Sequence, residues 1–157
     1  MIVILHNIRS LHNVGSIFRT ADAAGVEKIY LGGITPAPVD IFGKPRLPLT
    51  KVSLGAEKYV PWEKVKSTTT LIDKLKKQKY QIFAIEQSKK SVPYFKIKNK
   101  NLKSKITLVL GNEIKGLPSS ILKRADKILE IPMKGKKESL NVAVAFGIVV
   151  FNLPRGV

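Results

Sequence analysis

Short apolar runs rich in β-branched residues recur along the 157-residue chain, and helical patterns fall between several of them. The runs are almost uniformly apolar, which is typical of strands that are covered on both faces of a sheet. Helical periodicity is clearest over 14–24 and 71–79. Strands that alternate with helices predict an α/β fold with a parallel sheet flanked by helices. The expected strands span 2–5, 28–31, 81–85, 106–110 and 127–131.

The last apolar stretch, SLNVAVAFGIVVFNL over 139–153, has a composition that suits a strand or a helix. Its length favours a helix, for which Ser139 is the expected N-cap. Its apolar residues leave almost no polar face, so we expect burial on all sides, inside the domain or against another subunit. A homodimer is the corresponding expectation.

The charge balance is strongly basic, with 28 Lys and Arg against 11 Asp and Glu and a net charge of +17. A surplus of this size costs self-repulsion, which favours a polyanionic partner, above all nucleic acid. An anionic membrane surface and a generally lysine-rich proteome are the alternatives. The chain has no cysteine, which excludes disulfides, thiolate catalysis and cysteine-bound metal.

No segment has the pattern of a membrane span or a signal peptide. The longest nearly unbroken apolar run, 142–151, is far shorter than the roughly 20 residues that cross a bilayer. The opening MIVILHNIRS turns polar too early for a signal peptide. We therefore expect a soluble, cytoplasmic protein that does not associate with membranes.

The stretch HNVGSIFRT, 12–20, predicts a helix with an anion site at its start. Asn13 suits the N-cap and Gly25 the position just past the end of the helix. Gly15 would leave the N–H groups of the first turn uncovered, and Arg19, which faces outward, could bind a phosphate. The simpler alternative is a capped surface helix with an incidental arginine. One apolar stripe would contain Val14, Ile17, Phe18, Ala21 and Ala24.

Two further stretches place polar groups directly after buried strands. In LVLGNEIKGLP, 108–118, Gly111 would let a ligand approach the backbone, and Glu113 could hold an amine, a hydroxyl or the side chain of Arg19. In IPMKGKKESLNVA, 131–143, backbone groups of Ile131 and Met133 could face an adenine, and the lysines would suit phosphate. The alternatives are an ordinary strand-to-helix turn and a solvated loop with helix-capping residues.

Several common cofactor motifs are missing from the sequence. It contains no GxGxxG after a strand, no GxxxxGK[ST] and no HExxH, and its two histidines, His6 and His12, are too few for a histidine-rich metal site. We therefore expect no metal. His12 is a convenient base by its ordinary pKa, although a plain loop residue is the simpler interpretation.

Taken together, NVGSIFRTA, LGNEIKGL and IPMKGKKESLNVAVA resemble the motifs of the SpoU/TrmH branch of the SPOUT RNA methyltransferases. The match covers almost the whole chain, with the motifs in the expected order and spacing. The resemblance implies transfer of a methyl group from S-adenosylmethionine to a ribose 2′-hydroxyl of RNA, and a homodimer. It also implies a deep C-terminal trefoil knot, which hydrophobic periodicity does not suggest and which chains normally avoid.

The resemblance also implies roles for individual residues. The methyl donor would be held mainly by backbone groups of Gly111, Ile131 and Leu140, with Met133 nearby. A guanidinium stays protonated at physiological pH, so we expect Arg19 to bind the adjacent phosphate and polarise the 2′-oxygen rather than act as a base. The implied active-site residues are Asn13, Arg19, Glu113, Ser139 and Asn141.

We expect residues 1–157 to form a single methyltransferase domain without an accessory RNA-binding domain. The surface of this domain and of its dimer must then recognise the RNA. We favour tRNA over rRNA as the substrate. Two long segments are candidates for this contact: the proline- and glycine-rich stretch 32–50 and the lysine-rich stretch 89–105, for which a solubilising lysine face is the alternative. A non-catalytic RNA-binding relative and another nucleotide-binding α/β enzyme, such as a dehydrogenase, are the competing interpretations. The candidate RNA-binding residues are Arg19, Lys44, Arg46, Lys89, Lys90, Lys134 and Lys136.

Overall fold

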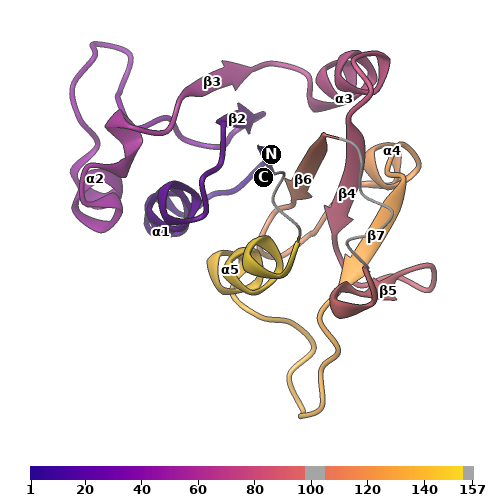
Figure 1. Ribbon diagram of the computed structural model, residues 1–157. Helices are drawn as coiled ribbons and strands as arrows, with labels where there is room; N and C mark the ends of the chain where they lie inside the picture. Colours follow the sequence, from indigo (N-terminus) through magenta and orange to yellow (C-terminus); the bar gives the residue numbers. More distant parts are fainter. Residues whose placement is uncertain (98–104, 154–157) are drawn as a thin grey trace.

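A computed structural model describes residues 1–97 and 105–153, which form a single parallel sheet with helices on both faces (Figure 1). The seven described strands lie in the order β3-β2-β1-β6-β4-β7-β5, and every pairing between them is parallel. The α/β architecture predicted from the sequence is therefore confirmed. The strands are β1 (Ile2–His6), β2 (Lys28–Gly32), β3 (Trp62–Val65), β4 (Gln81–Ile85), β5 (Val92–Pro93), β6 (Ile106–Leu110) and β7 (Lys127–Glu130).

The helices form a layer on each face of the sheet (Figure 1). α1 and α5 contact each other on one face, and α2 packs against the outer side of α1. α3 and α4 contact each other on the other face. The described helices are α1 (Leu11–Ala23), α2 (Leu47–Ser53), α3 (Thr68–Lys77), α4 (Ser119–Leu122) and α5 (Val142–Asn152), with short 3-10 turns η1 (Ala56–Lys58) and η2 (Tyr94–Lys96).

The central strands explain the uniformly apolar runs in the sequence. All of β6 is buried, and β1 is buried up to Leu5, because helices cover both faces. One core cluster lies beneath α1 and α5 and includes Phe18, Phe83 and Phe146. The other lies beneath α3 and α4 and includes Ile72. Each fully buried side chain of this kind contributes about 1.5–3 kcal/mol of hydrophobic stabilisation. The packed helix layers therefore fix the sheet, and with it the positions from which the loops at its edge begin.

Helix α1 begins three residues earlier than predicted. The N-cap is Ser10, whose hydroxyl accepts a hydrogen bond from the backbone N–H of Asn13 at 3.2 Å, so the prediction of Asn13 as the cap is wrong. Serine serves this position as well as asparagine, and the earlier start leaves the Asn13 amide free for other partners. The predicted apolar stripe is buried and Arg19 is exposed, as expected. Gly25, with φ +63°, follows the C-cap Ala24.

Gly15 allows α1 and α2 to pack closely, and it does not form an exposed anion site. It is buried where α1 crosses α2, and a Cβ atom built on it would lie 2.5 Å from the carbonyl oxygen of Leu49 and 3.1 Å from the Cβ of Val52. The absence of a side chain therefore lets the two backbones approach. The sequence-based interpretation of this glycine is wrong because it considered α1 without the helix beside it.

The segment 32–50 is less irregular than predicted. Its last residues belong to α2, which has Pro48 in its first turn, where a missing N–H costs nothing. Strand β3, which pairs with β2, was not predicted, because its sequence WEKV has two charged residues at its centre and lacks an apolar run. Helix α3 starts at Thr68, before the predicted 71, because Ser67 caps it by accepting a hydrogen bond from the N–H of Thr70.

The C-terminal stretch is the helix α5, as predicted from its length. Its N-cap is Asn141 rather than Ser139, since the Asn141 side chain accepts hydrogen bonds from the N–H groups of Ala143 and Val144. The helix is not buried on all sides in the single chain: Phe146 is fully buried, whereas Val144 is 51% exposed. Within residues 1–97 and 105–153, no helix is both long and apolar enough to cross a membrane.

Candidate active site

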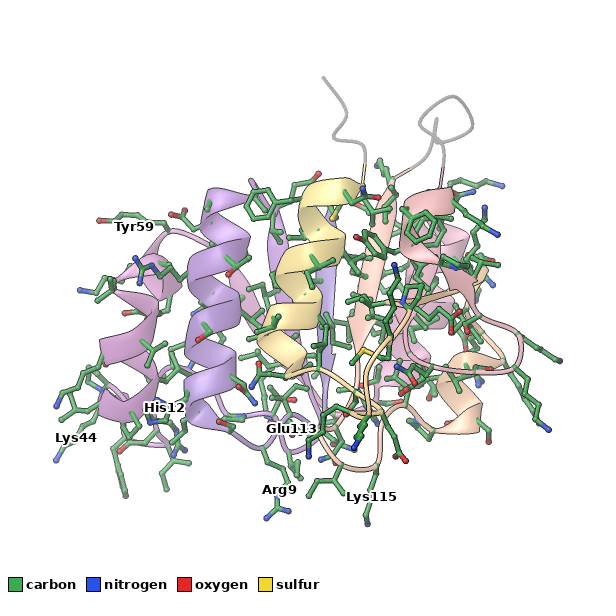
Figure 2. The ribbon with its side chains drawn as sticks, turned by 90° about the horizontal axis from the view of Figure 1, so that it is seen from below. Arg9, His12, Lys44, Tyr59, Glu113 and Lys115 are labelled. Atoms are coloured by element: carbon green, nitrogen blue, oxygen red, sulfur yellow. The ribbon has the colours of Figure 1, made fainter. Side chains whose placement is uncertain are left out.

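A pocket opens at the carboxyl ends of β4, β6 and β7, the edge at which open parallel sheets bind ligands. It holds about 750 Å³ of empty space and is open to solvent. Its walls are the loop after β4, the loop after β6, and the chain from the end of β7 to the first turns of α5. Figure 2 shows Glu113 at this edge, between the ends of the helices and the loops.

Three side chains from three distant parts of the chain form one hydrogen-bonded network beside the pocket. The Asn141 amide donates from Nδ2 to Oδ1 of Asn13 at 2.9 Å. The Asn13 amide donates from Nδ2 to Oε1 of Glu113 at 3.2 Å. The Oδ1 atom of Asn141 caps α5, so each amide has one orientation that satisfies all of its partners. The network therefore joins the start of α1, the loop after β6 and the start of α5.

Glu113 also holds the backbone that leads into α1. Its carboxylate accepts hydrogen bonds from the N–H of Ser10 at 3.0 Å and from the N–H of Arg9 at 3.0 and 3.2 Å. Burial raises the pKa of Glu113, but the hydrogen bonds from Ser10, Arg9 and Asn13 outweigh it and lower the pKa below its ordinary value. The anion at the start of this helix is thus the chain's own carboxylate. Arg19, which was suggested as a partner of Glu113 alongside an amine or a hydroxyl, is not among its partners in the single chain.

The predicted cofactor residues all line the pocket: Gly111, Ile131, Met133 and Leu140. Neither Ile131 nor Met133 forms a backbone hydrogen bond with any other residue of the described ranges, so their amide and carbonyl groups are available to the edge of a purine. Pro132 between them has no N–H and ends the pairing of β7. The pocket therefore combines free backbone groups and apolar walls, which fits S-adenosylmethionine.

A close backbone contact, which the sequence did not reveal, explains why position 111 is a glycine. A Cβ atom built on it would lie 2.6 Å from the carbonyl carbon of Gly116 and 2.7 Å from the nitrogen of Leu117. The loop after β6 therefore folds back against this glycine. The glycine shapes the loop that carries Glu113, in addition to lining the pocket.

The two other predicted active-site residues lie outside the network. Ser139 lines the pocket and is exposed. Arg19 is also exposed, and it lies six residues after Asn13, which corresponds to about 9 Å along the helix axis. In the single chain Arg19 does not line the pocket.

The predicted RNA-binding residues are spread over several loops. Lys44 lies at the same edge as Glu113 but at the far end of the molecule (Figure 2). Arg46 is half-buried, and its Nε donates to the carbonyl oxygen of Val39 at 3.4 Å. Part of the lysine-rich stretch, 98–104, lies outside the described residues. Of the predicted RNA-binding residues, Lys89 and Lys90 in the loop after β4 and Lys134 and Lys136 in the loop before α5 are exposed.

Glu86 is a pocket residue that the sequence analysis missed. It follows β4, and its carboxylate accepts hydrogen bonds from the N–H of Leu117 at 2.8 Å and from its neighbour Gln87 at 2.9 Å. It ties the loop after β4 to the loop after β6 on the wall of the pocket. The sequence did contain a signal for it: Glu86 directly follows a predicted buried strand, and Glu113 was selected because it lies shortly after another.

The parallel sheet and the pocket at its carboxyl edge define an α/β enzyme that binds a cofactor through loops and backbone groups. The model of the SpoU rRNA Methylase family matches residues 1–151, so the chain belongs to the SpoU methylase family. The resemblance identified from the three sequence stretches is thereby confirmed.

Relatives with assigned activities and solved structures agree with this membership. The chain is 34% identical over 155 residues to a tRNA (guanosine(18)-2′-O)-methyltransferase of Aquifex aeolicus, which covers 99% of this chain and 69% of the relative. It is 30% identical over 160 residues to the 23S rRNA (guanosine-2′-O-)-methyltransferase RlmB of Coxiella burnetii, over 99% of this chain and 58% of that protein. An AdoMet-bound rRNA methyltransferase from Sinorhizobium meliloti superposes with a TM-score of 0.85 at 32% identity, over 96% of this chain and 54% of that structure. The chain thus spans a little over half to about two thirds of these relatives.

Proposed function

We propose that this protein transfers a methyl group from S-adenosylmethionine to a ribose 2′-hydroxyl of RNA in the cytoplasm, with tRNA as the favoured substrate over rRNA. The observation that carries the proposal is the network of Asn13, Glu113 and Asn141 at the mouth of a pocket with free backbone groups. The net charge of +17 suits an RNA substrate. The activity printed for the Aquifex relative supports tRNA.

The residues of this chain mainly hold and align the reactants. S-adenosylmethionine supplies a methyl group on a sulfonium, which already has a good leaving group. The backbone at Ile131 and Met133, with Leu140, would hold the donor in the pocket. Asn13 and Asn141 present their amides beside it, and alignment of this kind supplies several kcal/mol of the barrier. Ser139 lies on the pocket wall, where its hydroxyl can hold the ribose.

Glu113 acts as a positioning residue rather than as the base. Its carboxylate accepts three different groups and has a lowered pKa, so it has little tendency to take a proton. Arg19, as a permanent cation, binds the phosphate next to the target ribose and polarises the 2′-oxygen. The proton of the 2′-hydroxyl is then released to solvent water, to which the pocket is open.

The proposal includes a homodimer built on α5 and the trefoil knot of the family. Val144 is 51% exposed and Leu140 39% exposed in the single chain, which leaves apolar surface at the pocket for a second copy to cover. Arg19 lies outside the pocket of its own chain, and a second copy offers a way to bring it to a bound RNA. The strand order supports the knot, because β6 inserts between β1 and β4 and β7 returns between β4 and β5.

We further propose that this one domain recognises RNA through its own surface. The candidate contacts are Arg19, Lys44, Arg46, Lys89, Lys90, Lys134 and Lys136. Each lysine or arginine that neutralises a phosphate makes RNA binding more sensitive to salt. A non-catalytic RNA-binding module needs the same basic surface but has no use for the Asn13–Glu113–Asn141 network.

The test is incorporation of labelled methyl from S-adenosylmethionine into unmodified tRNA and rRNA transcripts, followed by nuclease digestion and analysis for 2′-O-methyl nucleotides. We expect label in a 2′-O-methyl nucleotide of tRNA and its loss in Arg19→Ala, with donor affinity measured by calorimetry nearly unchanged. Donor binding without label in either RNA would contradict the proposed substrates. Absence of donor binding would overturn the methyltransferase assignment in favour of an RNA-binding module.

A further inference from the structure

A second groove lies at the same edge of the sheet, next to the donor pocket. We call it the edge groove. It is formed by residues that follow β1, β2 and β6, and it shares Asn112, Ile114 and Gly116 with the donor pocket. Asn13 donates a hydrogen bond to Glu113, which lies in the chain between the groove residues Asn112 and Ile114, so a ribose held at Asn13 would lie close to this groove. None of the residues proposed above for RNA binding lines it.

The edge groove is held in shape by two asparagines. Asn112 donates from Nδ2 to the carbonyl oxygen of Asn7 at 2.8 Å, and its Oδ1 accepts hydrogen bonds from the N–H groups of Ile114 at 3.0 Å and Lys115 at 2.9 Å. Asn7, in the left-handed region with φ +57°, accepts a hydrogen bond from the N–H of Ile34 at 3.0 Å. These bonds tie the three loops together, so a ligand meets walls that are already in place.

Two large apolar side chains are exposed at the groove. Ile34 is 65% exposed and Ile114 is 81% exposed, and they come from the loops after β2 and β6 respectively. Apolar side chains on either side of a groove can contact the faces of a nucleobase, as they do in enzymes that hold a base outside its stack. The exposure of both isoleucines is thus explained if a base lies between them.

The groove also carries positive charge that the protein itself does not neutralise. Arg9 and Lys115 line it, both are exposed, and neither forms an ion pair with a described residue. Figure 2 shows the two side chains extending outward from the edge at which Glu113 lies. Glu113 does not compete for them, because its carboxylate accepts backbone N–H groups and Asn13. Arginine and lysine in this setting suit phosphate groups.

We propose that the edge groove binds a nucleotide adjacent to the methylated one, with its base between Ile34 and Ile114 and its phosphates at Arg9 and Lys115. This inference rests on the proposed function, since it places the groove along the path of the substrate RNA. An acidic protein segment is the other ligand that the charges permit, but the wall shared with the donor pocket favours the RNA.

The charge contribution is tested by binding of a fluorescein-labelled, unmodified tRNA transcript over a range of salt concentrations. For the double variant Arg9→Ala/Lys115→Ala we expect at least a tenfold loss of affinity at low salt. The slope of log affinity against log salt should fall in magnitude by about 1.4, at about 0.7 for each lost contact to a single-stranded phosphate. Lys74→Ala/Lys77→Ala, which removes two exposed charges from α3 on the other face, should leave affinity within about twofold.

The base contact is tested with Ile34→Ser/Ile114→Ser in the same assay. We expect a several-fold loss of affinity with the salt slope unchanged, because no phosphate contact is removed. Tyr59→Ser, which alters an exposed aromatic residue at the opposite edge of the molecule (Figure 2), should bind as the unaltered protein does. S-adenosylmethionine affinity should remain unchanged in Arg9→Ala/Lys115→Ala and in Ile34→Ser alone, because none of these three residues lines the donor pocket. This control separates the edge groove from the donor pocket.

The outcomes distinguish this inference from the proposed function. If the groove variants bind RNA no worse than their controls while the unaltered protein methylates RNA, the inference is overturned, the function stands, and the groove is left to a protein partner. If the unaltered protein methylates no RNA but loses RNA binding in the groove variants, the groove is supported as a nucleotide site and the proposed function fails.

Discussion

At the scale of single residues, Asn141 has two separate tasks on its two amide atoms. Its Oδ1 caps α5 through the N–H groups of Ala143 and Val144, and its Nδ2 donates to Asn13 in the network with Glu113. One atom therefore serves stability and the other serves the site. Substitutions that change one atom at a time can separate the two tasks.

Asn141→Asp keeps the capping oxygen and loses the donor to Asn13. A carboxylate is favourable at a helix N-terminus, so we expect the free energy of unfolding to change by less than about 1 kcal/mol while methyl transfer falls at least tenfold. Asn141→Ala loses both atoms and should also destabilise the protein by about 0.5–2 kcal/mol. Urea unfolding and turnover, measured on both variants, check this. Full turnover in Asn141→Asp would show that the donor to Asn13 is dispensable.

The lowered pKa of Glu113 predicts a pH-dependent contribution to stability. The carboxylate is stabilised in the folded chain, so its contribution is fully present above its unfolded pKa and is lost as pH falls through the folded value. The difference in unfolding free energy between the unaltered protein and Glu113→Gln should therefore be largest near neutral pH and shrink in acid. Urea titrations between pH 7 and pH 3 measure it. A difference that does not vary with pH would contradict the assignment.

At the scale of elements, the contact between α1 and α2 depends on one missing side chain. Gly15 lies against the backbone of Leu49, whereas Gly147 of α5 has space, since its added Cβ would meet only Thr20 Cγ2 at 3.9 Å. The two helical glycines therefore differ in environment although the sequence presents them alike. The close contact is what brings α2 against the helix that carries Asn13.

Gly15→Ala and Gly147→Ala should consequently shift stability in opposite directions. Alanine favours a helix interior over glycine by about 1 kcal/mol, and at Gly147 we expect some of this gain. At Gly15 the new methyl group must force α1 and α2 apart, and overpacking of this kind costs about 1–3 kcal/mol. Urea unfolding of both variants tests the pair. An equal gain in both would show that α2 yields without cost.

At the scale of the whole molecule, the proposed homodimer would contact the exposed apolar surface of α5, next to the site. Val144 lies two residues after the start of the helix that Asn141 caps, so a partner packed there would lie close to the pocket. A dimer of this form would cover the exposed Val144 in the first turns of α5.

Val144→Glu should convert the dimer into a monomer, because it places a charge within an apolar interface. Light scattering after size-exclusion chromatography measures the mass directly. Ile41→Glu is the matched control, since Ile41 is 89% exposed in a loop and its substitution should leave the mass unchanged. A monomeric unaltered protein, or a dimer that survives Val144→Glu, would contradict an interface on α5.

The sequence by itself determined the class of fold and most of its regular elements. Strands β4 and β6 have the predicted bounds, and the predicted apolar stripe of α1 is the face that is buried. Both were predictable because periodicity is a local property, which the spacing of apolar residues along the sequence reveals. The sequence also indicated the carboxyl edge as the place of the site, since polar residues directly follow the buried strands there.

Only the tertiary structure decided which groups meet at that edge. Asn13 and Asn141 are 128 residues apart, and Asn13 and Glu113 are 100 apart, so their hydrogen bonds depend on the path of the whole chain. The same holds for Gly15, whose role depends on a helix more than 30 residues away. Local patterns carry no information about such partners, and for this reason the partners of Glu113 and the edge groove emerged only from the folded chain.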